Sequence, residues 1–418
     1  MTGSITLIGI GDDGCVSLTS RAINAIAQTE LLAGATRHLG FFPQYTGERL
    51  TFVSGLNTYL AQIVEAAKDK DICVLASGDP LFFGIGKRLL KLVGEADTPI
   101  DVEVVTSPSS VQLACAKALI PSDDIKVLSL HGRPMTGLVT RLQQGDTFAL
   151  LTDKDHNPVV IARHLLSYDE KCWRLVLCEH LGGSKERVTE FTVQELAAAS
   201  TDDIESLNVL LLQRQGQIYW GGLAMHCPDS AYQVLSPLNG LITKANTRAL
   251  AVARLGLTPG SCVWDIGSGS GSVAIEAAKQ AWNGHVYALE CNPPCFDVIE
   301  QNQQRHRVDN LTLVKSKAPC GLDDLPAPDA VFVGGSRGQM DPIVELVMSR
   351  LTPGGKLILS AVTLDSVSKF FDLCKTSQYH YEVVMLQSSV SQPLAHYQRY
   401  QAENPIHLFV ITKEGNNS

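Results

Sequence analysis

The sequence predicts an α/β protein with two unlike halves, of which the C-terminal half contains a doubly wound, mainly parallel sheet. Short apolar runs alternate with helical patterns along the chain, an order typical of parallel strands joined by helices. Two glycine-rich loops, at residues 9–14 and 267–271, each follow an apolar run. At 418 residues the chain is also too long for one ordinary domain. Together these observations indicate two or three domains, with a ligand-binding loop in each half.

The composition excludes several classes of protein. A content of 45% hydrophobic and 18% charged residues is typical of a globular protein with an apolar core. The net charge of −9 argues against a general nucleic-acid surface. We predict no membrane span, because no apolar segment approaches the ~20 residues required, and no signal peptide. Most of the 11 cysteines lie inside apolar runs, which favours a cytoplasmic protein with reduced cysteines and no metal site.

The N-terminal half is predicted to form two α/β lobes. Apolar runs indicate strands at residues 5–10, 31–33, 72–76, 102–106, 126–130, 147–152, 174–178 and 208–213. Helical patterns cover residues 19–27, 56–68, 110–117 and 158–166. A polar, proline-marked stretch near Pro121 predicts the boundary, giving lobes of about 1–121 and 122–215. Gly, Pro, Ser and Asn are frequent after residue 215, so we interpret 216–235 as a linker and 236–418 as the C-terminal domain.

The C-terminal domain is predicted to contain about seven strands. These are expected at residues 262–265, 284–290, 311–315, 329–333 and 356–360, with a late hairpin at 381–385 and 406–412. Helices are expected at residues 246–255, 273–279, 296–305 and 342–351, with one further helix before the hairpin. In such a sheet, ligands bind at the carboxyl edge of the strands.

The stretch from Cys262 to Lys279 carries the clearest functional signal. Gly267, Gly269 and Gly271 turn the chain between a buried strand and a helix, where backbone can approach a ligand closely. The next strand ends on Glu290, whose carboxylate is positioned to accept ribose hydroxyls. This G-x-G-x-G loop with a following acid indicates S-adenosylmethionine (SAM) rather than a dinucleotide, which prefers G-x-G-x-x-G. The alternative is a glycine turn that only packs the helix on the strand.

Residues 9–14 do match G-x-G-x-x-G, yet they do not predict a dinucleotide site. Such a fold requires an acid at the far end of the next strand, whereas Glu30 begins that strand. We therefore interpret Gly9 and its neighbours as a ligand loop of another kind. A second loop, at Gly78-Asp79-Pro80, makes a tight bend at the end of a buried strand and is followed by aromatic residues.

Several stretches of the sequence carry a resemblance to known families. The N-terminal half resembles the tetrapyrrole methylase family through residues 31–39, 75–86, 109–114, 129–134 and 179–188. The C-terminal half is similar to the Rossmann-like class I SAM-dependent methyltransferases that partner it, through residues 242–244, 264–275, 318–319 and 329–338. The resemblance covers nearly the whole chain and implies a bifunctional enzyme of cobalamin biosynthesis.

The resemblance implies SAM in both halves and a polycarboxylate tetrapyrrole as substrate. It implies methylation of C5 by the N-terminal half, and methylation of C15 with decarboxylation of a ring-C acetate by the C-terminal half. The residues implied to bind the cofactor are Gly9, Gly78, Asp79, Pro80, Ser109 and Ser110 in the N-terminal half, and Thr243, Gly267, Ser268, Gly269, Ser270, Gly271, Glu290 and Ala318 in the C-terminal half. Lys244 and Arg337 are candidate substrate contacts, although the run after Lys244, residues 316–317 and Arg337 depart from the family's pattern.

No catalytic residue is identified from the sequence, because methyl transfer from SAM requires mainly alignment of donor and acceptor. One alternative function is an RNA or DNA methyltransferase, suggested by Asn292-Pro293-Pro294, but that triplet follows the second strand of the domain and is interpreted as a turn. Another alternative is a non-enzymatic SAM sensor. We also expect a homo-oligomer.

Overall fold

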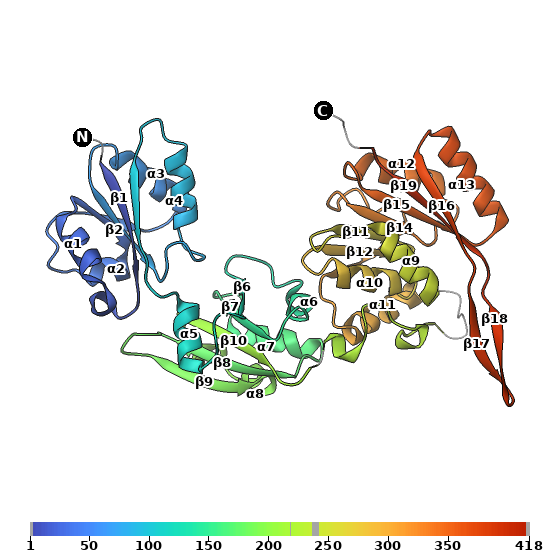
Figure 1. Ribbon diagram of the computed structural model, residues 1–418, viewed down its shortest axis with the longest axis horizontal. Coiled ribbons are helices and arrows are strands. Elements are labelled where there is room, and N and C mark those ends of the chain that lie inside the picture. The colour runs from blue at the N-terminus through green and yellow to red at the C-terminus, as the bar shows by residue number, and fades with distance from the viewer. Residues whose placement is uncertain (1–2, 218, 236–241, 415–418) are drawn as a thin grey trace. The chain divides into compact units, whose positions relative to one another are not determined.

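The computed structural model describes residues 3–217, 219–235 and 242–414. The chain folds into two compact units (Figure 1). Unit 1 comprises the described residues within 1–134, 146–163 and 173–215. Unit 2 comprises those within 135–145, 164–172 and 216–418, so two short segments of the N-terminal half belong to it.

The first lobe of unit 1 is a five-stranded parallel sheet in the order β3-β2-β4-β1-β5. Its strands are β1 (Ser4–Ile10), β2 (Leu31–Ala35), β3 (Glu48–Phe52), β4 (Ile72–Ser77) and β5 (Asp101–Val105). Its helices are α1 (Ser20–Gln28), α2 (Thr36–Gly40), α3 (Leu56–Ala66) and α4 (Gly86–Gly94), with a 3₁₀ turn at Gly14–Ser17. Along β1, Ile5 and Leu7 enter one core while Ile8 and Ile10 enter the other, because successive side chains of a strand point to opposite faces.

The second lobe of unit 1 is a mixed five-stranded sheet in the order β6-β7-β10-β8-β9. Its strands are β6 (Lys126–Ser129), β7 (Thr147–Leu151), β8 (Trp173–Glu179), β9 (Arg187–Thr192) and β10 (Asn208–Arg214). The helices are α5 (Ser110–Ala118), α7 (Pro158–Ser167) and α8 (Val193–Ala198), with a 3₁₀ turn at Thr201–Asp203. Val111, Ala114 and Cys115 of α5 pack against this second sheet. Because α5 packs on the second sheet, the boundary between the two lobes lies before α5 and therefore upstream of Pro121.

Unit 2 contains a seven-stranded sheet in the order β13-β12-β11-β14-β15-β19-β16. Its strands are β11 (Cys262–Ile266), β12 (His285–Glu290), β13 (Leu311–Lys315), β14 (Ala330–Val333), β15 (Lys356–Ala361), β16 (His380–Leu386) and β19 (Ile406–Thr412). Its helices are α6 (Leu138–Leu142), α9 (Ala245–Leu255), α10 (Ser272–Gln280), α11 (Pro293–Arg305), α12 (Met340–Arg350) and α13 (Leu364–Thr376). Only β19 runs antiparallel to its neighbours β15 and β16, so the predicted seven-stranded, mainly parallel sheet is confirmed.

Residues 219–235, which we predicted to be part of a linker, pack against the core of unit 2. Trp220, Cys227, Ala231 and Tyr232 are buried there beside α9 and α10, and short 3₁₀ turns lie at Trp220–Gly222 and Asp229–Ala231. The Gly- and Pro-rich composition of this stretch concealed its four buried side chains. The remaining predicted linker residues 236–241 lie outside the described residues.

Some strands have no counterpart among the predicted elements. β3 and β9 lie at sheet edges and are partly exposed, so they lack the continuous apolar run of a buried strand. The hairpin of β17 (Ser389–Leu394) and β18 (Tyr397–Ala402) extends from unit 2 as a long two-stranded arm with all its residues exposed (Figure 1). Among the described residues, no helix is long and apolar enough to cross a membrane.

Candidate functional site

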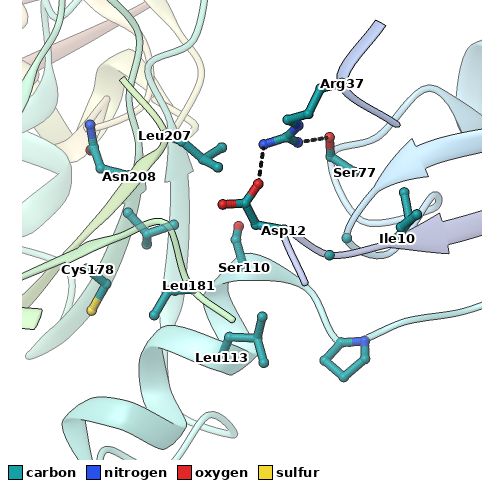
Figure 2. Close-up of a pocket in the computed structure, with 14 residues that line it drawn as sticks. Ile10, Asp12, Arg37, Ser77, Ser110, Leu113, Cys178, Leu181, Leu207 and Asn208 are labelled. Carbon is teal, nitrogen blue, oxygen red and sulfur yellow. Dashed lines mark hydrogen bonds and ion pairs between the residues drawn. The ribbon is translucent and has the colours of Figure 1, made fainter. Parts of the chain in front are cut away.

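Unit 1 contains a cavity of about 100 Å³ where the two lobes meet (Figure 2). Its lining residues come from the loops after β1, β4 and β8, from α2 and the start of α5, and from the start of β10. They are Ile10, Gly11, Asp12, Arg37, Ser77, Gly78, Pro108, Ser110, Leu113, Cys178, Leu181, Leu207, Asn208 and Val209. Most of this lining is apolar, while Asp12, Arg37 and Ser77 form a polar group on one side (Figure 2).

Two of the predicted site glycines let the strands of this cavity approach each other. The N–H of Gly78 donates to the carbonyl oxygen of Ile10 at 2.9 Å. A Cβ on Gly9 would collide with the carbonyl oxygen of Gly78, and Gly78 has a φ of +59° that favours glycine. Gly78 lines the cavity, whereas Gly9 does not line it but leaves room for the backbone of Gly78.

Among the other predicted residues of this half, one lines the cavity and three have structural roles near it. Ser110 lines the cavity. Ser109 is the N-cap of α5, where its hydroxyl accepts a hydrogen bond from the N–H of Gln112 at 3.2 Å. The carboxylate of Asp79 accepts from the N–H of Leu81 at 2.8 Å and so shapes the turn, and Pro80 is buried behind it. Ser109, Asp79 and Pro80 are absent from the lining, and their predicted contact with cofactor stays a prediction.

An ionic group that was not predicted from the sequence lies at the edge of this cavity. Nη1 of Arg37 lies 3.2 Å from Oδ1 of Asp12, and Nη2 donates to Oγ of Ser77 at 3.1 Å (Figure 2). Oδ2 of Asp12 lies 3.1 Å from Nδ1 of His180, at the end of β8. Burial, together with the charge of Arg37, lowers the pKa of neighbouring His38 to about 4, so His38 is neutral at pH 7. Asp12 lies within the glycine-rich loop of residues 9–14, which was the one signal available in the sequence.

Unit 2 contains a smaller cavity, of about 20 Å³, at the carboxyl edge of its sheet. The lining residues follow the adjacent strands β11, β12, β13 and β14, whose carboxyl ends meet at this edge. They are Ile266, Gly267, Leu289, Glu290, Cys291, Ser316, Lys317, Ala318, Gly335, Ser336 and Arg337. Gly267, Glu290, Ala318 and Arg337, all predicted site residues, are brought together here.

All three glycines in the loop of unit 2 have positive φ values, and at two of them a Cβ would also meet a neighbouring residue. Gly267 has a φ of +74°, and a Cβ there would lie 2.6 Å from the carbonyl oxygen of Gly335. Gly271 has a φ of +75°, is the N-cap of α10, and would place a Cβ against Ile299. The N–H of Gly269 donates to Oε2 of Glu290 at 2.8 Å. The loop is therefore a backbone-lined cradle, a shape that suits a nucleoside cofactor.

Glu290 is 7% exposed, and its carboxylate is partly occupied by backbone donors. Oε1 accepts from the N–H groups of Cys291 and Asn292, both at 2.8 Å, in addition to the bond from Gly269 to Oε2. A carboxylate has about four acceptor sites, so at least one remains for a ribose hydroxyl. The residues present thus fit the predicted SAM site, in which Glu290 would hold the ribose.

Asp265, at the end of β11, is fully buried behind the loop. Its Oδ2 accepts from the N–H of Ala274 at 3.0 Å, and Oδ1 has no hydrogen-bond partner in the described parts of the chain. Desolvation raises the pKa of this carboxyl to about 7. The hydroxyl of Ser268 donates to the carbonyl of Asp265 at 2.8 Å, while that of Ser270 is buried without a described partner. Both serines are therefore placed inside the loop rather than toward the cavity lining.

Thr243 and Lys244 do not line either cavity. Nζ of Lys244 lies 3.5 Å from Oδ2 of Asp229, and the carbonyl of Thr243 accepts from Arg248 at 2.6 Å. Lys244 is thus already paired with a carboxylate of its own chain. Its predicted contact with substrate stays a prediction, and neither its position nor its pairing adds support for it.

Arg337 and Lys317 both line the cavity of unit 2 and are exposed. Neither makes a hydrogen bond or an ion pair with any residue that the structure describes. Arg337 has a φ of +45°, a conformation that a non-glycine residue adopts only at a cost in backbone energy. The cavity therefore presents two cations without an ion-pair partner among the described residues, together with the carboxylate of Glu290.

The triplet Asn292-Pro293-Pro294 begins α11 directly after β12, with Asn292 as the N-cap. Proline is favoured at the first turn of a helix, so the interpretation of the triplet as a structural turn is supported. No group of three His, Cys, Asp or Glu side chains that could hold a metal ion occurs among the described residues.

Comparisons with known proteins match both halves of the chain. The family described as "Tetrapyrrole (Corrin/Porphyrin) Methylases" matches residues 4–197, and the "Precorrin methyltransferase domain" matches residues 237–413. A Precorrin-6Y C(5,15)-methyltransferase [decarboxylating] from Sinorhizobium sp is 33% identical over 369 residues, covering 88% of this chain and 87% of the relative.

Two relatives from Salmonella typhimurium each match about half of the chain. A Cobalt-precorrin-7 C(5)-methyltransferase is 35% identical over 211 residues, covering 50% of this chain and 100% of the relative. A Cobalt-precorrin-6B C(15)-methyltransferase (decarboxylating) is 33% identical over 177 residues, covering 42% of this chain and 91% of the relative.

Proposed function

Because this chain belongs to the precorrin-6Y C(5,15)-methyltransferase (decarboxylating) family, we propose that its two halves catalyse separate methylations of one tetrapyrrole. The chain is a SAM-dependent methyltransferase of cobalamin biosynthesis, and a nucleic-acid methyltransferase is not favoured. The substrate is precorrin-6Y, which is methylated at C5 and C15 and loses the carboxyl group of its ring-C acetate.

The C5 step is assigned to the N-terminal half and the C15 step, with decarboxylation, to the C-terminal half. Two observations support this assignment. The match to the relative named for C5 is 211 residues long and the match to the one named for C15 is 177, close to the lengths of the predicted domains 1–215 and 236–418. Each half also contains its own cavity at the carboxyl ends of parallel strands. We retain 1–215 and 236–418 as the proposed functional domains.

The residues act mainly by positioning. Bound SAM supplies an activated methyl group, and the meso carbons of a reduced tetrapyrrole are enamine-like nucleophiles. In unit 2, the loop from Gly267 to Gly271 would cradle the cofactor and Glu290 would hold its ribose. Lys317 and Arg337 would then face the carboxylates of the substrate, because guanidinium and ammonium groups bind carboxylates strongly. Correct alignment alone contributes ~7–11 kcal/mol in well-oriented reactions.

The observation that carries the proposal is the presence of two separate cavities in a chain of this family. The test incubates the purified full chain with methyl-labelled SAM and either precorrin-6Y or RNA. We expect two labelled methyl groups and one CO2 for each precorrin consumed, and no label in RNA. Incorporation of only one methyl group by a folded chain would refute the assignment of a reaction to each half.

We also propose that the enzyme is a homo-oligomer. The β17–β18 hairpin is exposed along its whole length, with Tyr397 at 76% and Tyr400 at 80% exposure, and an isolated two-stranded hairpin is marginally stable in water. A second copy of the chain could cover it. Light scattering coupled to gel filtration should give a mass above 45.1 kDa, and a monomer would refute this part.

We further propose that the enzyme acts in the cytoplasm without a nucleic-acid partner. All 11 cysteines are free thiols, as expected in a reducing compartment, and the chain is acidic overall.

A further inference from the structure

The cavity of unit 1 offers one side chain able to accept a proton at neutral pH. Among the described lining residues, the ionisable ones are Asp12, Arg37 and Cys178. Arginine is a permanent cation in proteins. Burial raises the pKa of the Cys178 thiol to about 12, so it is almost entirely protonated. The carboxylate of Asp12 is therefore the only basic group on this wall.

The neighbours of Asp12 hold its carboxylate in place without using all of its acceptor sites. Oδ1 pairs with Nη1 of Arg37 at 3.2 Å, and Oδ2 lies 3.1 Å from Nδ1 of His180. Arg37 is itself held by the hydroxyl of Ser77 at 3.1 Å (Figure 2). Since a carboxylate has about four acceptor sites, both oxygens can still receive a proton or a hydrogen bond from the cavity.

A path leads from Asp12 to solvent through the second lobe. Nε2 of His180 lies 3.5 Å from Oε2 of Glu205, and it has no closer hydrogen-bond partner in the described chain. The side chain of Glu205 is 54% exposed, whereas those of Asp12 and His180 are 17% and 19% exposed. His180 therefore lies between a carboxylate in the cavity and a carboxylate in solvent.

The backbone of His180 keeps the imidazole in this place. Its φ is +47°, in the left-handed region that non-glycine residues rarely adopt. Its N–H donates to the carbonyl of Leu207 at 3.0 Å, which fixes the turn after β8. Strained residues of this kind persist where the surrounding structure holds them, often at functional sites.

We propose that Asp12 accepts the proton released when C5 is methylated, and that His180 and Glu205 pass this proton to solvent. The proposal rests on the proposed function, namely the C5 step in the N-terminal half. In that step C5 forms a bond to the methyl carbon while the methyl–sulfur bond breaks, and its electron pair stays on sulfur. C5 then carries both hydrogen and methyl. When the C5–H bond breaks, its electron pair returns to the macrocycle and the proton moves to Asp12.

The proton then leaves by exchange through the imidazole. Nδ1 of His180 receives a proton from Asp12 while Nε2 releases one to Glu205. Glu205 then loses this proton to solvent, and the Asp12 carboxylate is restored. The imidazole is left as its Nδ1–H tautomer, so rotation of the ring must turn the unprotonated nitrogen toward Asp12 before the next turnover.

The nearby His38 does not serve as the acceptor. It is buried behind Ser77, 3.1 Å from that hydroxyl, and it does not line the cavity.

The first test replaces Asp12 by asparagine in the full chain. Asp12→Asn keeps the shape of the side chain but removes the base, and we expect kcat for C5 methylation to fall by ~100-fold or more. SAM affinity, measured by calorimetry, should not change. C15 methylation and CO2 release provide an internal control, because they occur in the other half of the same molecules.

Asp71 provides a matched control for this variant. Its carboxylate accepts from the hydroxyl of Ser4 at 2.7 Å, and it precedes β4 and does not line the cavity. Asp71→Asn should retain the full C5 rate. A normal C5 rate in Asp12→Asn would overturn the proposal, and so would a loss of SAM affinity that accounts for the whole defect.

The second test addresses His180, which acts through Asp12. His180→Ala should lower kcat for the C5 step without raising KM for the tetrapyrrole, and added imidazole should restore the rate. Imidazole should not rescue Asp12→Asn. A defect in His180→Ala that imidazole leaves unchanged would reject His180 as a proton carrier. A wild-type chain that releases CO2 but never methylates C5 would instead refute the proposed function.

Discussion

The two cavities both adjoin a glycine-containing loop at the end of a parallel strand, but they differ in what lines them. The cavity of unit 1 is also lined by the end of β8 and the start of β10, which pair antiparallel, whereas that of unit 2 is lined from parallel strands alone. The cavity of unit 1 is mostly apolar, and its charged groups are paired: Asp12 contacts Arg37 and His180. The cavity of unit 2 contains Lys317 and Arg337 without described partners. Paired charges suit proton movement within the site, whereas two exposed cations without ion-pair partners suit the binding of an anion from solution.

The two units also differ in how their loops depend on glycine. In unit 2, Gly267 and Gly271 have positive φ values and little room for a side chain. In unit 1, Gly9 is required because the end of β4 lies against it, and Asp12 on the same loop contributes a side chain to the cavity. The loop of unit 2 therefore offers backbone to its ligand, while the loop of unit 1 also offers a functional group.

The largest expected effect comes from filling the cradle of unit 2. Gly267→Val adds a branched side chain whose Cβ lies 2.6 Å from the carbonyl oxygen of Gly335, at a φ of +74°. We expect SAM binding to be lost in unit 2 and retained in unit 1, so calorimetry should resolve two sites in the wild type and one in the variant. If the variant still bound SAM at two sites, the loop would not be a cofactor cradle.

The second prediction concerns the free energy of unfolding of unit 2, which should fall while that of unit 1 is unchanged. Nε of Arg248 donates to Oε1 of Glu276 at 2.6 Å, and the two side chains are 0% and 1% exposed. Arg248 also pairs with Asp229 and stacks near Tyr232, in the segment that we predicted to be a linker. Arg248→Met should destabilise unit 2 by ~3–5 kcal/mol, because it removes the arginine that pairs with the buried carboxylate of Glu276.

Differential scanning calorimetry can measure this change. Only the transition of unit 2 should move, and that of unit 1 should stay in place. Arg254→Met, which removes a half-exposed surface pair with Glu382, is the matched control and should cost ~1 kcal/mol or less. Equal effects of the two variants would contradict the buried role of Arg248.

The third prediction tests the unpaired cations. If Arg337 binds a carboxylate of the substrate, Arg337→Ala should weaken tetrapyrrole binding by ~1.5–3 kcal/mol and leave SAM affinity unchanged. Arg337→Gly removes the same charge but tolerates the φ of +45°, so it should bind substrate as poorly while unfolding at a higher temperature than Arg337→Ala. An unaltered KM in both variants would leave Arg337 without a role in binding.

The smallest effect is expected at Glu290. Glu290→Ala removes the acceptor for three backbone N–H groups and for the proposed ribose contact, and should cost ~1–3 kcal/mol of SAM affinity in unit 2. Glu290→Gln keeps an acceptor oxygen and should lose less. If SAM affinity were unchanged in Glu290→Ala, the only role of the side chain would be to hold the backbone of the loop.

The sequence alone predicted most of the sheet architecture and the position of the glycine loop of unit 2. Buried parallel strands are continuous apolar runs, and the glycine loop, its helix and Glu290 lie within about 30 residues, so local patterns were sufficient. The resemblance to known families then indicated the activity. The edge strands β3 and β9 and the burial of residues 219–235 were missed, because neither produces a local apolar periodicity.

Only the tertiary structure brought together the groups that distinguish the two sites. Asp12 and His180 are 168 positions apart, and their contact depends on how the two lobes of unit 1 meet. The same applies to Lys317 and Arg337, which follow different strands and become neighbours because β13 and β14 end at one edge of the sheet. The pairing of Lys244 with Asp229 was equally invisible in the sequence. A local pattern specifies a turn or a strand, whereas the partner of a charged side chain is decided by chain segments that meet only after folding.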